Sequence, residues 1–149
     1  MTMMKTILGA AASVALTAGA ALADPALIFD LGGKFDKSFN EAAFNGAQRW
    51  AEETGGSFNE IELQSEAQRE QALRRFAEAG FNPVITMGFA MADPLSTVAP
   101  DYPDTKFAVV DVTWLDAPNV RQIGFAEHEG SYLVGMMAAM ASKTGTVGF

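Results

Sequence analysis

The fold is decided by ALIFDLGGKFDKSFNEAAFNGAQRWAEETGG, residues 26–56. Its first six residues are a short apolar run that ends at two glycines, as in a strand buried in a parallel sheet. Ser38 and Glu41 then match a capping box, with the serine as N-cap and the glutamate three residues later. Apolar residues recur at helical spacing behind them until Gly55 and Gly56, where the helix is expected to stop. The stretch therefore predicts one strand followed by one helix.

The same alternation continues along the chain. Apolar and alternating runs predict strands at residues 57–63, 83–87, 106–110 and 120–125, and residues 145–149 resemble the start of another. Ser65 and Gln68 match a second capping box, and the helix predicted between Ser65 and Gly80 has an apolar face that includes Ala72, Leu73, Phe76 and Ala77. Helices are also predicted before Pro100 and at 127–143. The last of these has apolar residues all around it and should be largely buried. This order indicates an α/β lobe with an open, mostly parallel sheet and helices on both faces.

The composition excludes several classes of function. The chain has 149 residues, 49% of them hydrophobic, with 10 Lys+Arg against 18 Asp+Glu, one His and no Cys. A net charge of −8 argues against nucleic-acid binding, because phosphates are bound by clustered Lys and Arg. Because the chain has no Cys, disulfides and thiolate catalysis are ruled out, and because it has one His, multi-histidine metal sites are ruled out as well. We expect neither a metal nor a cofactor.

Residues 1–23 have the pattern of a secretory signal peptide. Lys5 precedes an Ala-, Val- and Leu-rich run that ends in Ala21-Leu22-Ala23, the small-x-small pattern cleaved by signal peptidase. The alternative, an N-terminal membrane anchor, is disfavoured because the run is short and rich in Ala and Gly. We therefore predict cleavage after Ala23, a lobe over residues 24–149, and a periplasmic protein. Since no Cys follows the signal, the protein should not be lipid-anchored.

The carboxyl ends of the predicted strands mark the candidate binding site, because ligands bind there in open parallel sheets. They bring acidic residues to one rim, with two phenylalanines beside them: Asp30, Asp36, Asp111 and Glu129, with Phe39 and Phe89. A carboxylate can accept two hydrogen bonds from a ribose diol, and an aromatic ring stacks on a flat heterocycle. The rim thus favours a neutral, hydroxylated, planar ligand. The run from Gly32 to Lys34 fits neither phosphate-binding glycine pattern.

Each of these residues also has a purely structural interpretation. Phe39 lies on the apolar face of its helix and could belong to the core. Asp111 could start the turn that follows its strand, and Asp36 could be a solvated loop charge. His128 is interpreted as a helix-start residue, since no nucleophile motif accompanies it.

Two motifs resemble a known family. Residues 35–46, FDKSFNEAAFNG, are similar to the DxSFNxxxxxG signature of the basic membrane protein (BMP) family of ABC-transporter solute-binding proteins. Residues 129–135, EGSYLVG, resemble its EGSFLVG segment, and the resemblance extends over 26–149. It implies a periplasmic-binding-protein type I fold, in which two lobes close on a ligand, usually a purine nucleoside. Family members are about twice as long, so the second lobe would be missing from this chain.

The resemblance also implies roles for individual residues. Phe39 would stack on the base, Asp36 and Asn40 would bind its polar edge, and Asp111 would bind the ribose hydroxyls. Many members carry a lipid-modified Cys after the signal, and this chain has none.

Gly88 and Phe89 would line the pocket in the same way. The implied protein is not an enzyme, delivers its ligand to an inner-membrane ABC permease, and is monomeric when full length.

Two alternatives to this function stay open. One is a receptor for a sugar or another small hydroxylated ligand. The other is a nucleoside hydrolase that uses the Asp cluster with a divalent cation.

Overall fold

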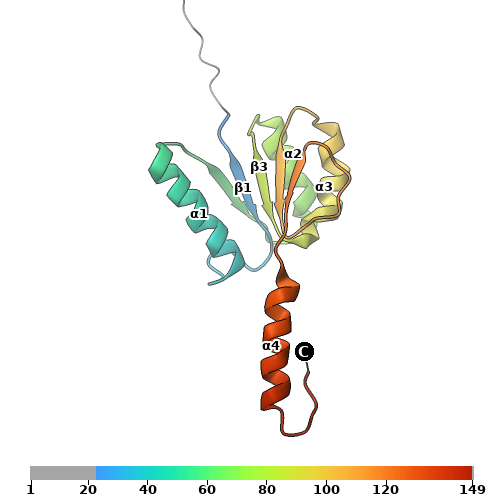
Figure 1. Cartoon of the computed structure of the whole chain (residues 1–149). Helices are drawn as coiled ribbons and strands as arrows, with labels where there is room; N and C mark the ends of the chain where they lie inside the picture. Colours follow the sequence, from blue (N-terminus) through green and yellow to red (C-terminus); the bar gives the residue numbers. More distant parts are fainter. Residues whose placement is uncertain (1–22, 149) are drawn as a thin grey trace, which may run out of the picture.

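The computed structural model describes residues 23–148 (Figure 1). The predicted signal peptide, apart from Ala23, lies outside the described residues. The strands are β1 (Ala26–Phe29), β2 (Asn59–Glu62), β3 (Val84–Met87), β4 (Phe107–Val110) and β5 (Val120–Ile123). The helices are α1 (Phe39–Thr54), α2 (Gln68–Glu78), α3 (Ala92–Val98) and α4 (Glu127–Ala141), with 3-10 turns η1 (Phe89–Met91) and η2 (Ala99–Asp101) around α3. The predicted alternation of strands and helices is thus confirmed as far as residue 141.

All five strands are parallel and lie in the order β2-β1-β3-β4-β5. Ile28 of β1 is in register with Ile61 of β2 on one side and with Thr86 of β3 on the other. The strand order reverses between β1 and β3, because the chain moves outward to β2 first and to β3 and β4 afterwards. Such a switch point is where an open parallel sheet leaves a crevice for ligands at its carboxyl edge.

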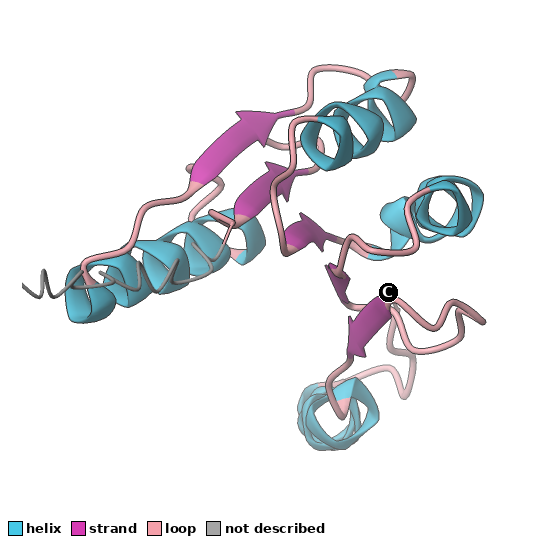
Figure 2. Cartoon of the chain, turned by 90° about the horizontal axis from the view of Figure 1, so that it is seen from above, coloured by secondary structure: helices cyan, strands magenta, loops and turns pink. Residues whose placement is uncertain are grey.

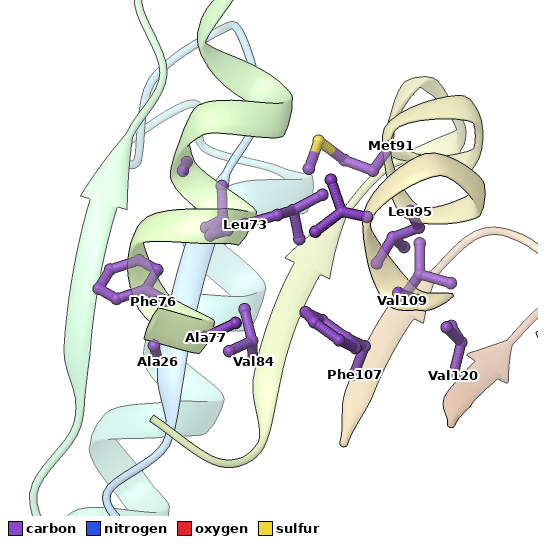
Figure 3. Close-up of a cluster of buried hydrophobic side chains, with 14 of the residues drawn as sticks. Ala26, Leu73, Phe76, Ala77, Val84, Met91, Leu95, Phe107, Val109 and Val120 are labelled. Carbon is purple, nitrogen blue, oxygen red and sulfur yellow. The ribbon is translucent and has the colours of Figure 1, made fainter. Parts of the chain in front are cut away.

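Helices cover both faces of the sheet, as predicted (Figure 2). Ala26 and Ile28 of β1 point into the core shared with α2 and α3. That core also contains Leu73 of α2 and Leu95 of α3. Leu27 and Phe29 point to the opposite face, where α1 packs. Figure 3 shows the first of these cores, which is built from aliphatic and aromatic side chains between the sheet and the two helices. Because successive strand side chains point to opposite faces of the sheet, they form two separate cores, one against α2 and α3 and one against α1.

The start of α2 agrees only in part with the capping box predicted from Ser65 and Gln68. The side-chain oxygen Oε1 of Gln68 accepts hydrogen bonds from the backbone N–H groups of Ser65 (3.2 Å) and Gln64 (2.7 Å). The hydroxyl of Ser65 makes no capping bond in return. The four residues predicted for its apolar face are all buried: Ala72, Leu73, Phe76 and Ala77.

The prediction that the helix at 127–143 is largely buried is wrong for this structure. α4 projects away from the carboxyl edge of the sheet, and none of its residues is buried (Figure 1). Its apolar side chains therefore face solvent, and Met140 is 83% exposed. Residues 145–148 form no strand, because no other strand lies beside them within residues 23–148 to complete a hydrogen-bonded ladder. No helix in that described range has the length and apolar content to cross a bilayer.

We expect this apolar helix to drive self-association of the chain. Exposed contiguous apolar surface favours association, and Leu133, Met137 and Met140 are all exposed. Replacing Met137 and Met140 by Glu should shift the chain toward monomer, measured by sedimentation velocity across a concentration series. As a control, glutamates in place of the exposed polar residues Asn45 and Gln48 of α1 should leave the association state unchanged. A parent chain that stays monomeric at high concentration would contradict this expectation.

Candidate functional site

Gly88 lies at the switch point, directly after β3. Its φ of 95° is one that glycine adopts readily. A Cβ atom at this position would lie 3.8 Å from Cε1 of Phe39 and 3.9 Å from Oδ2 of Asp30. The ends of β1 and β3 and the start of α1 therefore meet in one place, and the structure brings Phe39 and Gly88 together as the sequence analysis expects.

Both interpretations of Phe39 describe part of its surroundings. Its half-buried ring packs against the core formed by Leu27, Phe29 and Met87. The same residue also lines an apolar groove of about 680 Å³ between α1 and the sheet. The ring is thus held in place by the core while part of it stays accessible, which suits a stacking platform.

Asp36, and not Ser38, caps α1. The predicted capping bond of the Ser38 hydroxyl is absent. The carboxylate of Asp36 instead accepts backbone N–H bonds from Ser38 (2.8 Å), Asn40 (3.0 Å) and Glu41 (3.2 Å). Glu41 reaches back to the N–H of Lys37 at 3.0 Å, one residue earlier than a capping box on Ser38 requires. Asp36 replaces Ser38 as the cap because its carboxylate accepts hydrogen bonds from three free N–H groups at once.

These hydrogen bonds lower the pKa of Asp36 below its ordinary value of 3.8, the N–H of Asn40 having the largest effect. A carboxyl whose pKa is lower in the folded state stabilises the fold above its unfolded pKa. That stabilisation is lost as the pH falls through the lowered folded pKa. Most of the Asp36 carboxylate is therefore committed to the start of α1, and its contact with a ligand stays a prediction.

We expect Asp36→Ala to lower the melting temperature at neutral pH and to lose this effect in acid. The difference from the parent should be full above about pH 4 and should shrink as the pH falls further, because the parent's own carboxylate then becomes protonated. Thermal unfolding followed by circular dichroism from pH 7 to pH 2 measures it. Asp93→Ala, in the first turn of α3, is a control acidic variant. A difference that is constant with pH would contradict the capping role.

Asn40 is buried, with only 3% of its surface exposed. Its side-chain Nδ2 donates to the backbone carbonyls of Asp30 (3.2 Å) and Gly33 (3.1 Å). Its Oδ1 is also buried and has no hydrogen-bond partner within the described part of the chain. The amide thus ties the loop after β1 to α1, and a buried acceptor remains available beside the candidate site. A ligand contact by Asn40 stays a prediction.

Asp111 ends β4 in a left-handed conformation, with a φ of 73°. Its N–H donates to the carbonyl of Ile123 at 2.7 Å, which ties the end of β4 to β5. Asn and Asp tolerate this conformation better than most residues, which agrees with the alternative that Asp111 starts a turn. Its carboxylate takes part in none of the ion pairs formed within residues 23–148. The turn therefore presents an unpaired acidic group at the carboxyl edge.

The loop that follows Asp111 is held by Gln122 of β5. The Gln122 amide accepts from the N–H of Leu115 at 2.7 Å and donates to its carbonyl at 2.8 Å. This loop carries Trp114, an exposed aromatic residue that the sequence analysis did not select. Its position shortly after a strand end was the only available signal. Phe89, which was selected, is 67% exposed at the start of η1 and is free to contact a ligand.

Of the predicted acidic rim, Asp30 is neutralised by a cation within the described part of the chain, and the other three carboxylates are not. Asp30 forms a two-bond ion pair with Arg69 of α2, at 2.9 and 3.1 Å. Asp36 is bound by backbone N–H groups, and Glu129 lies on α4, which leaves the sheet. At the sheet edge itself, Asp111 is therefore the member whose carboxylate has no ionic partner within residues 23–148. No cluster suited to holding a metal ion occurs among residues 23–148.

Known proteins are similar to this chain in sequence and in fold. A family model described as "ABC transporter substrate-binding protein PnrA-like" matches residues 25–149. The chain belongs to the Bmp family. The resemblance drawn from the two sequence motifs is thereby confirmed.

The similar Bmp proteins are considerably longer than this chain. A "CD4+ T-cell-stimulating antigen" of Listeria monocytogenes is 34% identical over 83% of the chain and 36% of the relative. An "ABC transporter nucleoside-binding protein" of Lactococcus lactis is 31% identical with the same coverage. The crystal structure of an ABC-transporter solute-binding protein from Aeropyrum pernix is 37% identical, with a TM-score of 0.73 over 78% of the chain and 32% of that structure. The chain thus spans about a third of the length of these relatives.

Proposed function

We propose that this chain is the ligand-binding first lobe of a Bmp-family receptor that captures a purine nucleoside for an inner-membrane ABC permease. The observation that carries the proposal is the pairing of a stacking surface with an unpaired carboxylate at one sheet edge. Phe39 is held by the core and stays partly accessible beside Gly88. Asp111 lies two strands away from β1, directly after β4, and its carboxylate has no ionic partner among residues 23–148. A planar base and a ribose diol need these two groups.

The comparisons support the same ligand class. The Lactococcus lactis relative is named a nucleoside-binding protein, and the family description is of substrate-binding components of ABC transporters. A receptor should return its ligand unchanged, so we propose that the protein is not an enzyme. Full-length protein is proposed to act as a monomer that docks on its permease.

A ligand panel tests the proposal. Inosine, adenosine and guanosine are titrated by NMR against the chain. Ribose and hypoxanthine, the two halves of inosine, are the matched controls, and galactose represents the sugar alternative. Nucleosides should bind more tightly than either half, because only they reach both Phe39 and Asp111. Tighter binding of galactose or ribose would support the sugar receptor instead.

The hydrolase alternative is tested in the same samples. Inosine is incubated with the chain and Ca²⁺ and then analysed by liquid chromatography. Intact inosine supports a receptor, whereas free hypoxanthine and ribose at a rate proportional to protein concentration would show a hydrolase.

We also propose that the protein is exported to the periplasm and cleaved between Ala23 and Asp24, without a lipid anchor. Intact-mass spectrometry of material recovered from the periplasm should give a chain that begins at Asp24. Replacing Ala21 and Ala23 by Leu should block processing, because signal peptidase requires small residues at these two positions and leucine is large. Leu22→Val is a control that leaves both small residues in place. A periplasmic protein that retains residues 1–23 would contradict the prediction.

A further inference from the structure

An ion pair borders the candidate site and is not among the predicted ligand residues. Both carboxylate oxygens of Asp30, directly after β1, accept hydrogen bonds from Arg69, at 2.9 Å from Nε and 3.1 Å from Nη2. The two side chains are only 17% and 13% exposed. This fork-to-fork geometry is the strongest form of Arg–carboxylate pairing. The pair therefore ties the end of β1 to the start of α2.

The pair lies at the switch point itself. Oδ2 of Asp30 is 3.9 Å from the position that a Cβ atom of Gly88 would occupy, and Cε1 of Phe39 is 3.8 Å from the same position. The backbone carbonyl of Asp30 also accepts a hydrogen bond from the buried amide of Asn40. Asp30 is thus next to the groups that would contact a ligand, and Arg69 is bonded directly to its carboxylate.

Arg69 sets the charge of this end of the site. A carboxylate that is mostly removed from water attracts a cation strongly, and here the protein supplies that cation itself. The guanidinium stays protonated at any physiological pH, so the neutralisation is permanent. Without Arg69, the carboxylate of Asp30 would face the space beside Phe39 without a partner. An amine-bearing ligand could then take the place of the guanidinium.

We propose that Arg69 is a specificity-determining residue, which neutralises Asp30 so that the site beside Phe39 selects neutral over cationic planar ligands. The inference rests on the proposed function in placing the ligand at this switch point. It adds a rule about ligand charge: a planar ligand carrying an ammonium group is rejected at this end of the site, whereas its neutral hydroxyl counterpart is accepted.

Benzyl alcohol and benzylammonium test this rule, because both offer a flat ring to Phe39 and they differ in charge. Binding is followed through the Gly88 amide resonance by NMR at pH 7 and low salt. The parent should favour benzyl alcohol. Arg69→Met should raise the affinity for benzylammonium relative to benzyl alcohol about two- to fivefold, the size expected of one ion pair near the surface.

Two further variants separate charge from structure. Asp30→Asn combined with Arg69→Met removes the carboxylate as well and should return the ratio to that of the parent. Arg74→Met is the matched control, since Arg74 lies on the same helix and pairs with Asp101 at 2.7 Å instead. Circular dichroism confirms that each variant is folded. The double variant replaces Arg69→Met if the single variant unfolds, because it leaves no buried carboxylate without a partner; Glu66, which also contacts Arg69, is exposed.

The outcomes separate this inference from the proposed function. An unchanged ratio in folded Arg69→Met, or a ratio in the double variant that equals that of Arg69→Met, overturns the charge rule even if nucleosides bind. If the double variant must replace Arg69→Met, a ratio that differs from the parent's overturns it. A shifted ratio in a chain that binds no nucleoside keeps the charge rule and overturns the proposed ligand.

Discussion

The chain is expected to bind inosine at least about a hundredfold more weakly than the full-length Lactococcus lactis relative does. The chain matches 36% of that relative's length, so any contact that the rest of the relative makes is missing here. Binding has to overcome several kcal/mol of lost translational and rotational freedom before any contact adds affinity. A site closed between two lobes also excludes water, whereas the carboxyl edge of a single lobe stays open to it.

The matched control is the segment of the Lactococcus lactis relative that aligns with this chain. Isothermal titration calorimetry measures the full-length relative, and NMR titration at millimolar ligand measures both short chains. The two short chains should have similar, weak affinities. If this chain binds inosine as tightly as the full-length relative, the pocket lies wholly within one lobe, and the two-lobe interpretation must be abandoned.

The sheet could be predicted because its signals are local. The apolar run at β1 and the alternation with α1 and α2 depend on side chains that follow one another in the sequence. The predicted strands are longer than the observed ones. Leu31, for example, lies beyond β1 and is exposed, since the chain turns at Gly32, whose φ is 116°. The apolar pattern marks which residues can be buried and does not mark where the backbone turns.

The partners of the acidic residues could not be predicted. Asp30 and Arg69 are 39 positions apart and meet only because β1 and α2 lie side by side in the fold. Spacing alone does not say that Asp36 would replace Ser38 as the cap of α1, because both are acceptors close to the same free N–H groups. The burial of α4 was predicted from its apolar residues, and that inference fails where no second surface is present to pack against.

The second large effect is expected at Asp111. Asp111→Asn should weaken inosine binding about 5- to 150-fold, because loss of a charged acceptor for the ribose hydroxyls costs roughly 1–3 kcal/mol. Asn tolerates the left-handed conformation at this position, so the melting temperature should stay close to that of the parent. NMR titration measures the dissociation constant. Asp116→Asn, in the same exposed loop, is the control and should bind inosine like the parent.

Phe39→Leu is expected to have an effect of similar size on the same titration. Leucine keeps an apolar side chain against Leu27 and Met87 but removes the ring, and base stacking on an aromatic ring contributes about 1–3 kcal/mol. Phe35→Leu changes an exposed aromatic residue of the loop that precedes α1 and should leave the affinity unchanged. Loss of inosine binding in both Phe39→Leu and Asp111→Asn, with free ribose affected by Asp111→Asn alone, would assign the base to Phe39 and the sugar to Asp111. If both variants bind inosine like the parent, the nucleoside does not occupy this edge of the sheet.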